Sequence, residues 1–190
     1  MMTKKIKLTV LTCVLFVGII QLKAQNQLEI YPINHGSLVM TFQGKAIYVD
    51  PVGATELYKD YPNPNFIIIT DIHGDHLSLN TLKSLNLDDA KIVAPQAVYD
   101  QLPLELQKKT QVYNNSDSNS YTVLSMTIEA VPMYNLREEA LNFHPKGRGN
   151  GYIINLNGER IYISGDTEDI PEMRELTNVD KAFICMNLPY

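Results

Sequence analysis

The sequence has little that could cross-link it and little positive charge outside its first residues. Tryptophan is absent, and only two of the 190 residues are cysteines. Cys13 lies in an apolar N-terminal run, so removal of that run would leave Cys185 without an intrachain disulfide partner. Any internal cross-link in the remainder must have another source, and a bound metal ion is the candidate.

The one long apolar run lies at the N-terminus. Three lysines precede residues 8–20, and Ala24 supplies a small residue for cleavage. The run is too short to span a bilayer comfortably, because roughly 20 apolar residues are needed. We therefore predict a signal peptide at residues 1–24 and an exported protein, either periplasmic or secreted. The alternative is lipidation of Cys13, but Thr12 stands where a smaller residue is more usual.

Basic residues are scarce beyond the predicted cleavage point. Residues 1–24 hold four of the 16 basic residues and no acidic residue, so 12 basic and 21 acidic residues remain and the formal charge is −9. Such an acidic chain gives no reason to expect binding to nucleic acid or insertion into a membrane after cleavage. Residues 25–190 contain no repeat or long linker, and their length fits one domain acting on a small-molecule substrate.

The first half predicts alternating strands and helices. Strands are expected at residues 28–31, 37–42, 45–49, 66–70 and 91–94, with helices after Leu77 and after Pro95. This alternation is typical of an α/β layer.

The second half predicts mainly strands. The polar residues 114–120 indicate a surface loop, residues 121–131 a β-rich run, and residues 134–149 an irregular, glycine-containing segment. Asn157-Gly158 lies between two β runs and predicts a tight hairpin, while Pro171 suits the first turn of a helix.

Two aspartates and two histidines surround one glycine in "FIIITDIHGDHLS", directly after a predicted strand. One interpretation is a simple strand-to-helix turn, with Gly74 at positive φ, Asp75 capping the helix and the histidines solvated. The other is a metal site, because imidazole and carboxylate are the ligands of catalytic zinc and related ions. Alternation places Asp71 and His73 on one side, while Asp75 and His76 turn away after the glycine. One loop could thus supply ligands to two metal positions.

The motif "TDIHGDH" resembles the metal-binding signature of the metallo-β-lactamase superfamily, normally Thr-His-x-His-x-Asp-His. "YISGDT" resembles a later strand end of that superfamily, "NHGSLVMTFQGKAIYVDP" is similar to the opening hairpin of its simpler hydrolases, and "VPMYN…FHPKGRGNGYII" resembles the segment before the second hairpin. These pieces occur in the expected order over nearly the whole predicted mature chain.

The resemblance implies an α/β fold, an αββα four-layer sandwich with its C-terminal part incomplete. It implies an exported metal-dependent hydrolase that uses a metal-bound hydroxide on an ester, lactone, amide or phosphodiester. The cofactor would be zinc, as one or two ions, with manganese or iron as alternatives. By position, Asp71 and His73 would hold the first ion and Asp75 and His76 the second. Asp166 would bridge them, which makes Asp75 and Asp166 the candidate catalytic residues.

Three departures from the family pattern affect this interpretation. Asp71 replaces the usual leading histidine, which favours manganese or iron beside zinc. Tyr134 stands near the place of the next histidine, and His144 is either its substitute or a loop residue without a ligand role. The chain also ends at Tyr190, before the family's final histidine, so we expect one tightly bound metal, a weak second site and poor hydrolysis. We also expect association into a homo-oligomer through the uncovered apolar strand "KAFICM" at residues 181–186.

Four other residues have weaker functional interpretations. His35 either lines the mouth of the site or is a hydrogen-bonded structural residue, and Asp50 either orients a ligand histidine or caps a turn. Lys146 and Arg148 either offer positive charge to an anionic substrate or belong to a solvated loop. The alternative to an active hydrolase is a catalytically impaired or non-catalytic metal- or ligand-binding relative on the same fold.

Overall fold

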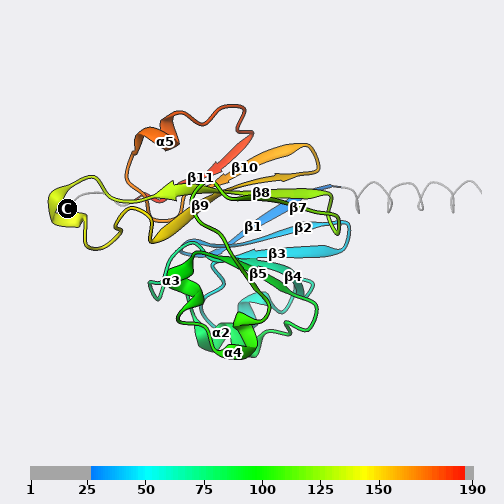
Figure 1. Cartoon of the computed structure of the whole chain (residues 1–190). Helices are drawn as coiled ribbons and strands as arrows, with labels where there is room; N and C mark the ends of the chain where they lie inside the picture. The colour runs from blue at the N-terminus through cyan, green and yellow to red at the C-terminus, as the bar shows by residue number, and fades with distance from the viewer. Residues whose placement is uncertain (1–26, 187–190) are drawn as a thin grey trace, which may run out of the picture.

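The computed structural model of the protein describes residues 27–186, and its strands form two mixed sheets. The predicted signal peptide and Cys13 lie outside the described residues. Figure 1 shows the two sheets packed face to face, with helices beyond each of them. Within residues 27–186, no helix has the length and apolar character needed to cross a bilayer.

The first sheet comes from the N-terminal half and has the order β1-β2-β3-β4-β5-β6. Its strands are β1 (Glu29–Asn34), β2 (Ser37–Phe42), β3 (Lys45–Val49), β4 (Pro64–Ile68), β5 (Lys91–Ala94) and β6 (Thr110–Val112). The strands β1 to β3 pair antiparallel, whereas β3 to β6 pair parallel. The parallel strands are joined by crossovers that contain α2 (Leu79–Ser84), α3 (Gln96–Tyr99), α4 (Leu104–Gln107) and the 3-10 helix η1 (Thr55–Tyr58).

The second sheet comes from the C-terminal half and has the order β11-β10-β9-β8-β7. Its strands are β7 (Ser118–Tyr121), β8 (Met126–Met133), β9 (Gly149–Leu156), β10 (Glu159–Ile163) and β11 (Lys181–Phe183). The 3-10 helix η2 (Glu138–Ala140) precedes β9, and α5 (Pro171–Arg174) lies between β10 and β11. Only β11 is parallel to its neighbour.

Apolar side chains fill the spaces between these layers. One cluster joins β2, β3 and β4 to β8, β9 and β10 and forms the core between the sheets. A second packs the outer face of the first sheet against the helices α2, α3 and α4, and a smaller third lies between the second sheet and α5. The predicted αββα layering is therefore confirmed, with α5 as the one α-helix on the second sheet's outer face among the described residues.

The predicted elements are largely in place. The β9–β10 hairpin turns at Asn157-Gly158, where φ is 55° and 80°, as a primed turn requires. Pro171 occupies the first turn of α5, because its missing N–H is not needed there.

Two predictions in the second half were wrong. The expected loop 114–120 includes the start of β7, and the expected run 121–131 is broken by a turn at residues 122–125, where Ser125 has a φ of 48°. The β7–β8 hairpin was missed because β7 is short and mostly exposed, so it shows no apolar alternation.

The sheets also meet through a backbone hydrogen bond at one end of the sandwich. The Asn150 N–H in β9 donates to the carbonyl oxygen of Thr70, which follows β4, at 3.0 Å. Gly149 makes this approach possible, because a Cβ there would lie 2.9 Å from the Thr70 oxygen. The loop after β4 is thereby held against the start of β9.

Candidate metal centre

The loop "DIHGDH" begins at Asp71, three residues after the end of β4, and carries four of the predicted ligands. The backbone N–H groups of His76 and Leu77 both donate to the carbonyl oxygen of His73, which closes a tight turn. Gly74 does not adopt a positive φ, and Ser78 rather than Asp75 caps α2. The interpretation of this loop as a simple capped turn is therefore wrong in both particulars.

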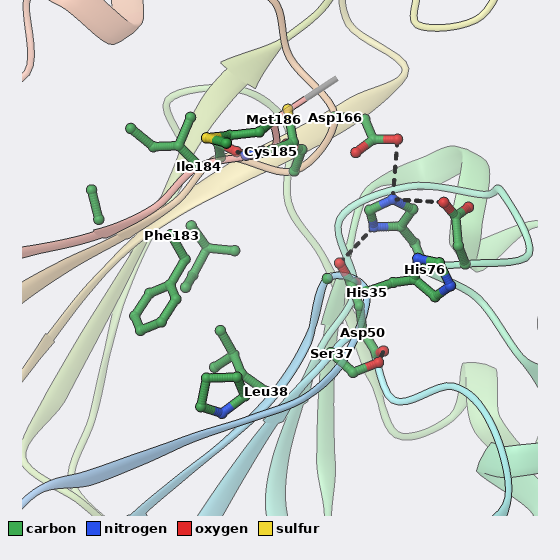
Figure 2. Close-up of a pocket in the computed structure, with 17 residues that line it drawn as sticks. His35, Ser37, Leu38, Asp50, His76, Asp166, Phe183, Ile184, Cys185 and Met186 are labelled. Carbon is green, nitrogen blue, oxygen red and sulfur yellow. Dashed lines mark hydrogen bonds and ion pairs between the residues drawn. The ribbon is translucent and has the colours of Figure 1, made fainter. Parts of the chain in front are cut away.

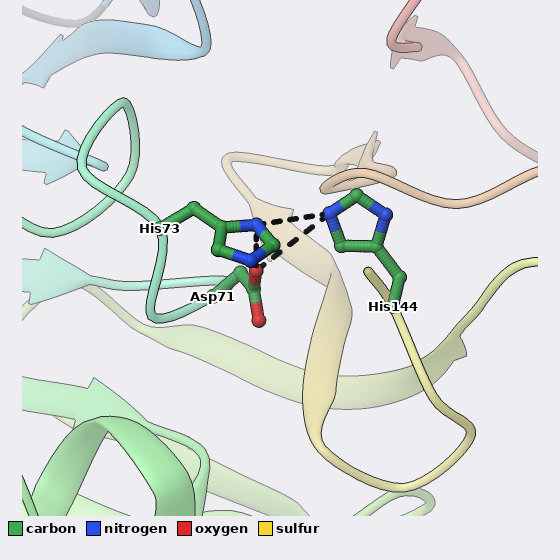
Figure 3. Close-up of side chains that lie close together, drawn as sticks. All are labelled: Asp71, His73 and His144. Atoms are coloured by element: carbon green, nitrogen blue, oxygen red, sulfur yellow. Dashed lines mark hydrogen bonds and ion pairs between the residues drawn. The ribbon is translucent and has the colours of Figure 1, made fainter. Parts of the chain in front are cut away.

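The first cluster consists of Asp71, His73 and His144 (Figure 3). His73 Nδ1 lies 2.9 Å from Asp71 Oδ2 and 3.1 Å from His144 Nε2. His144 comes from the irregular segment before β9, and its Nε2 lies 3.8 Å from Asp71 Oδ2. The structure thus brings His144 to the position that a ligand would need, 71 residues along the chain from His73.

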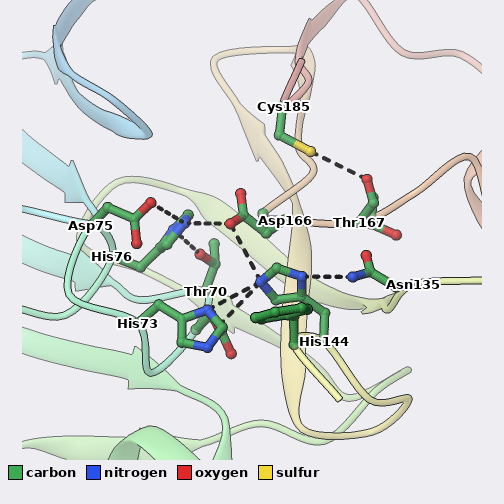
Figure 4. Close-up of polar contacts among 12 residues, drawn as sticks. Thr70, His73, Asp75, His76, Asn135, His144, Asp166, Thr167 and Cys185 are labelled. Carbon is green, nitrogen blue, oxygen red and sulfur yellow. Dashed lines mark hydrogen bonds and ion pairs between the residues drawn. The ribbon is translucent and has the colours of Figure 1, made fainter. Parts of the chain in front are cut away.

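The second cluster consists of Asp75, His76 and Asp166 (Figure 4). Asp166 follows β10 and is delivered by Gly165, whose φ is 57°. His76 Nε2 lies 3.2 Å from Asp166 Oδ2 and 3.9 Å from Asp75 Oδ2. His76 is buried and Asp75 is exposed, so the second cluster opens on its Asp75 side.

Asp166 lies between the two clusters. The same oxygen, Oδ2, is 3.2 Å from His76 Nε2 and 3.4 Å from His144 Nε2. Burial alone would raise the pKa of Asp166, but hydrogen bonds from His144 and His76 outweigh it and hold the pKa below its usual range. The carboxylate therefore stays ionised at its position between the two clusters.

Asp50 fixes the orientation of the His76 ring through its Nδ1 atom. It is almost fully buried, and its Oδ2 accepts a hydrogen bond from His76 Nδ1 at 2.8 Å. The orientation predicted for Asp50 is thus present, and it directs His76 Nε2 toward Asp166. Burial opposes the charged imidazole, but the hydrogen bonds to Asp166 and Asp50 outweigh it and raise the pKa of His76 to about 11.

Thr70 and Asn135 support the clusters, although neither is among the predicted site residues. Thr70 donates its N–H to Asp50 Oδ1 at 2.7 Å and its hydroxyl to Oδ2 at 2.6 Å. Asn135 Nδ2 lies 3.1 Å from His144 Nδ1 and donates to the carbonyl oxygen of Ala140. Thr70 is the first residue of the motif "TDIHGDH", which was a usable signal, whereas nothing local marks Asn135.

Lys146 and Arg148 each form an ion pair with a carboxylate. Lys146 pairs with Glu172 at 2.7 Å, and Arg148 donates two hydrogen bonds to Asp71. Tyr134 donates to Glu172 at 2.8 Å and belongs to neither cluster. Both cations therefore form ion pairs, and the suggestion that they attract a substrate stays a prediction.

A pocket of about 510 Å³ opens beside the second cluster (Figure 2). Asp75, His76 and Asp166 line one side, and His35 lies exposed at its edge. Apolar side chains also line the pocket, namely those of Leu38, Ile163, Phe183, Ile184 and Met186. His35 thus lies at the mouth of the site, outside both clusters of ligand atoms.

The donor set suits a divalent cation. Each cluster offers three imidazole or carboxylate atoms within 4.8 Å of one another. These nitrogen and oxygen donors fit zinc, manganese or iron, and buried carboxylates and imidazoles converging in this way are stabilised by a shared cation. The residues present therefore fit one or two metal ions.

Comparisons with known proteins agree with this geometry. A family model described as a beta-lactamase superfamily domain matches residues 29–187. The chain is 25% identical over 170 residues to a UPF0173 metal-dependent hydrolase of Staphylococcus saprophyticus, a match covering 80% of this chain and 69% of that protein.

Two solved structures show the same similarity. A crystal structure described as a metal-dependent hydrolase from Parabacteroides distasonis has a TM-score of 0.77 and 40% identity, covering 88% of this chain and 74% of that one. A metallo hydrolase from the archaeon Ignicoccus hospitalis has a TM-score of 0.60 and 21% identity, covering 77% and 64%. At the lower identity the similarity concerns the fold.

Proposed function

The chain belongs to the metallo-β-lactamase superfamily and is a metal-dependent hydrolase of that group, and on this premise we propose that Asp166 joins its two clusters into one hydrolytic centre. The observation that carries the proposal is the position of Asp166 Oδ2, 3.2 Å from a histidine of the second cluster and 3.4 Å from a histidine of the first. A carboxylate placed in this way can serve two cations at once.

The protein groups have distinct tasks in this centre. Divalent cations held there would lower the pKa of water from ~15.7 to as little as ~7 and polarise the scissile carbonyl group. Asp50 holds His76 in one orientation, and Asn135 lies against the ring of His144. Asp75 has a half-exposed side chain on the pocket side, so its carboxylate can accept a proton from the attacking water and pass it to the leaving group.

The pocket favours an uncharged substrate that carries an apolar group. Its wall includes Leu38, Phe183 and Met186, which suit an acyl or aryl portion packed beside the scissile bond. Among the described residues that line it, none is lysine or arginine. Of the substrates that the sequence suggests, an ester, lactone or amide therefore fits better than a phosphodiester.

The identity of the metal is proposed from the ligand atoms in the two clusters. The ligand atoms are nitrogen and oxygen alone, so zinc is the proposed metal. Manganese or iron is the alternative, because Asp71 adds a carboxylate to the ligands.

Export to the periplasm or secretion is proposed from residues 1–24, with their lysines, apolar run and Ala24.

The experiment that tests this function compares two aspartates on the same segment. Asp166→Asn removes the shared charge with little change of shape, and we expect it to lower bound metal and ester hydrolysis together. Asp169→Asn is the matched control, because Asp169 is exposed and pairs with Arg174 rather than with either cluster. Metal content is measured by elemental analysis, and turnover with nitrophenyl esters and a bis-nitrophenyl phosphate.

A second comparison uses histidines. His73→Ala should lower metal content, whereas His35→Asn should not, because Asn tolerates the φ of 48° at that position and His35 belongs to neither cluster. Full metal content and full hydrolysis in Asp166→Asn would refute the shared centre. Faster hydrolysis of the phosphodiester than of the esters would refute the proposed substrate class.

A further inference from the structure

Arg148 forms a bidentate ion pair with Asp71, a residue of the first cluster. Its Nε donates to Asp71 Oδ1 at 3.2 Å, and its Nη2 donates to Oδ2 at 2.9 Å. The same Nη2 lies 3.4 Å from His73 Nε2 and also donates to the carbonyl oxygen of Phe143. Asp71 is fully buried and the Arg148 side chain is 18% exposed, so water screens this pair weakly.

The backbone around Arg148 leaves this side chain few alternatives. Gly147 has a φ of 87°, and the next glycine, Gly149, packs so closely that a Cβ there would lie 3.2 Å from Asp71 Oδ1. Arg148 is thus held between a turn and the first residue of β9. The ion pair therefore depends on how β9 approaches the loop after β4.

The two clusters consequently differ in charge. A histidine that binds a metal is in its neutral form. Counted with neutral histidines, the second cluster carries two negative charges, on Asp75 and Asp166, and a third carboxylate, Asp50, lies directly behind His76. The first cluster carries one negative charge, on Asp71, and Arg148 cancels it. A divalent cation gains more from the second cluster, because the Coulomb energy depends on the net charge that it approaches.

We propose that the Arg148–Asp71 ion pair sets the order in which the two clusters fill. The first cation binds to Asp75, His76 and Asp166, and Arg148 weakens binding of a second cation at Asp71, His73 and His144. This order rests on the proposed function, and it is the reverse of the expectation that the position held by Asp75 and His76 would be the weak one.

A cation at the first cluster has to share the Asp71 carboxylate with the guanidinium. Oδ2 faces both His73 Nδ1 and Arg148 Nη2, each at 2.9 Å, so it is the oxygen for which the two positive charges compete. In this respect Arg148 is a positioning and charge-setting residue. It touches no group of the second cluster in the described part of the chain.

The test is a calorimetric titration of the metal-stripped protein with manganese(II). Wild type should bind one ion tightly and a second ion more weakly. Arg148→Met removes the charge but keeps a long apolar stem, and it should tighten the weak site about tenfold or more, in the range seen when groups around metal ligands are changed. Arg148→Lys, which retains a positive charge, is the control and should leave the second site weak.

Two further variants assign the sites and guard against poor folding. Asp75→Asn should abolish the tight site, whereas His73→Ala should preserve it. Asp71→His combined with Arg148→Met leaves no uncompensated buried charge, and it should bind two ions. Asp71→His alone leaves the guanidinium without its partner, and it should bind the second ion no better than wild type.

The outcomes separate the two hypotheses. Equal affinity at the two sites in wild type, or a weaker second site in Arg148→Met, would overturn the filling order while leaving the metal centre in place. Loss of the tight ion in His73→Ala with retention in Asp75→Asn would also overturn it. Wild-type protein that binds no manganese or zinc would overturn the proposed function and the order with it.

Discussion

Asp50 offers a demanding test of the centre, because it belongs to neither cluster and yet orients a predicted ligand. Its carboxylate accepts hydrogen bonds from the Thr70 N–H, the Thr70 hydroxyl and His76 Nδ1, at 2.6–2.8 Å. Asp50→Asn keeps the shape and keeps one oxygen as acceptor. It removes the negative charge and turns an NH₂ group toward the hydroxyl or the imidazole.

The expected effects differ between the metal-free and the metal-bound protein. A hydrogen bond to a charged group contributes about 1.5–3 kcal/mol, so the metal-free variant should lose about 2–3 kcal/mol of unfolding free energy. Loss of a group that orients a metal-bound histidine typically costs about 10- to 100-fold in metal affinity. The pKa of His76, about 11, should fall because Asp50 is one of the two carboxylates that raise it.

The assay combines urea denaturation of the metal-stripped protein with calorimetric titration by zinc. Asp89→Asn provides the matched control, since the same chemical change is made at an exposed position. If Asp50→Asn unfolds within about 0.5 kcal/mol of wild type and binds zinc within about twofold, Asp50 does not orient His76 and the account of the second cluster fails.

Three other changes test neighbouring parts of the structure. Gly149→Ala should lower both thermal stability and metal content, since its Cβ would lie 2.9 Å from a backbone oxygen. Gly74→Ala is the control, because a Cβ at Gly74 has open space around it. Wild-type stability and metal content in Gly149→Ala would refute the close approach. Asn135→Leu should weaken metal binding without changing the fold, because it removes the polar contact to His144, and unchanged zinc affinity would count against that role. Partial burial opposes ionisation of Glu168, but Arg137 and two backbone N–H groups lower its pKa below the ordinary value. The contribution of the Glu168 carboxylate to stability is therefore present above the unfolded pKa of about 4.3 and is lost as the pH falls through the folded pKa. Glu168→Gln should flatten the acid side of a plot of melting temperature against pH. A variant whose plot has the same acid side as wild type would contradict this role of Glu168.

The sequence was most informative where a local pattern carries the structure. Apolar runs predicted the central strands, and Asn157-Gly158 predicted the β9–β10 hairpin. The grouping of His73 and His76 with carboxylates predicted two neighbouring clusters, and the structure brings these side chains together. Each of these features depends on residues close to one another in the chain.

The sequence was least informative where a partner lies far along the chain. β6 has only three residues, too few to show an alternation, and it forms because a neighbouring strand edge is available. The pairing of Arg148 with Asp71 spans 77 residues and has no local signature. Charge in a glycine-containing loop is ordinarily solvated, so nothing short of the three-dimensional structure could identify that pair.

The way in which both clusters draw on both sheets has a kinetic consequence. The loop after β4 supplies one part of each cluster, whereas His144 and Asp166 come from segments that border the second sheet. The ligands can meet only after the two halves of the chain have docked, which is expected late in folding because such distant contacts carry a large loop-closure cost. A bound cation should therefore hold the N-terminal and C-terminal halves of the chain together. It should slow unfolding while leaving the rate of folding nearly unchanged.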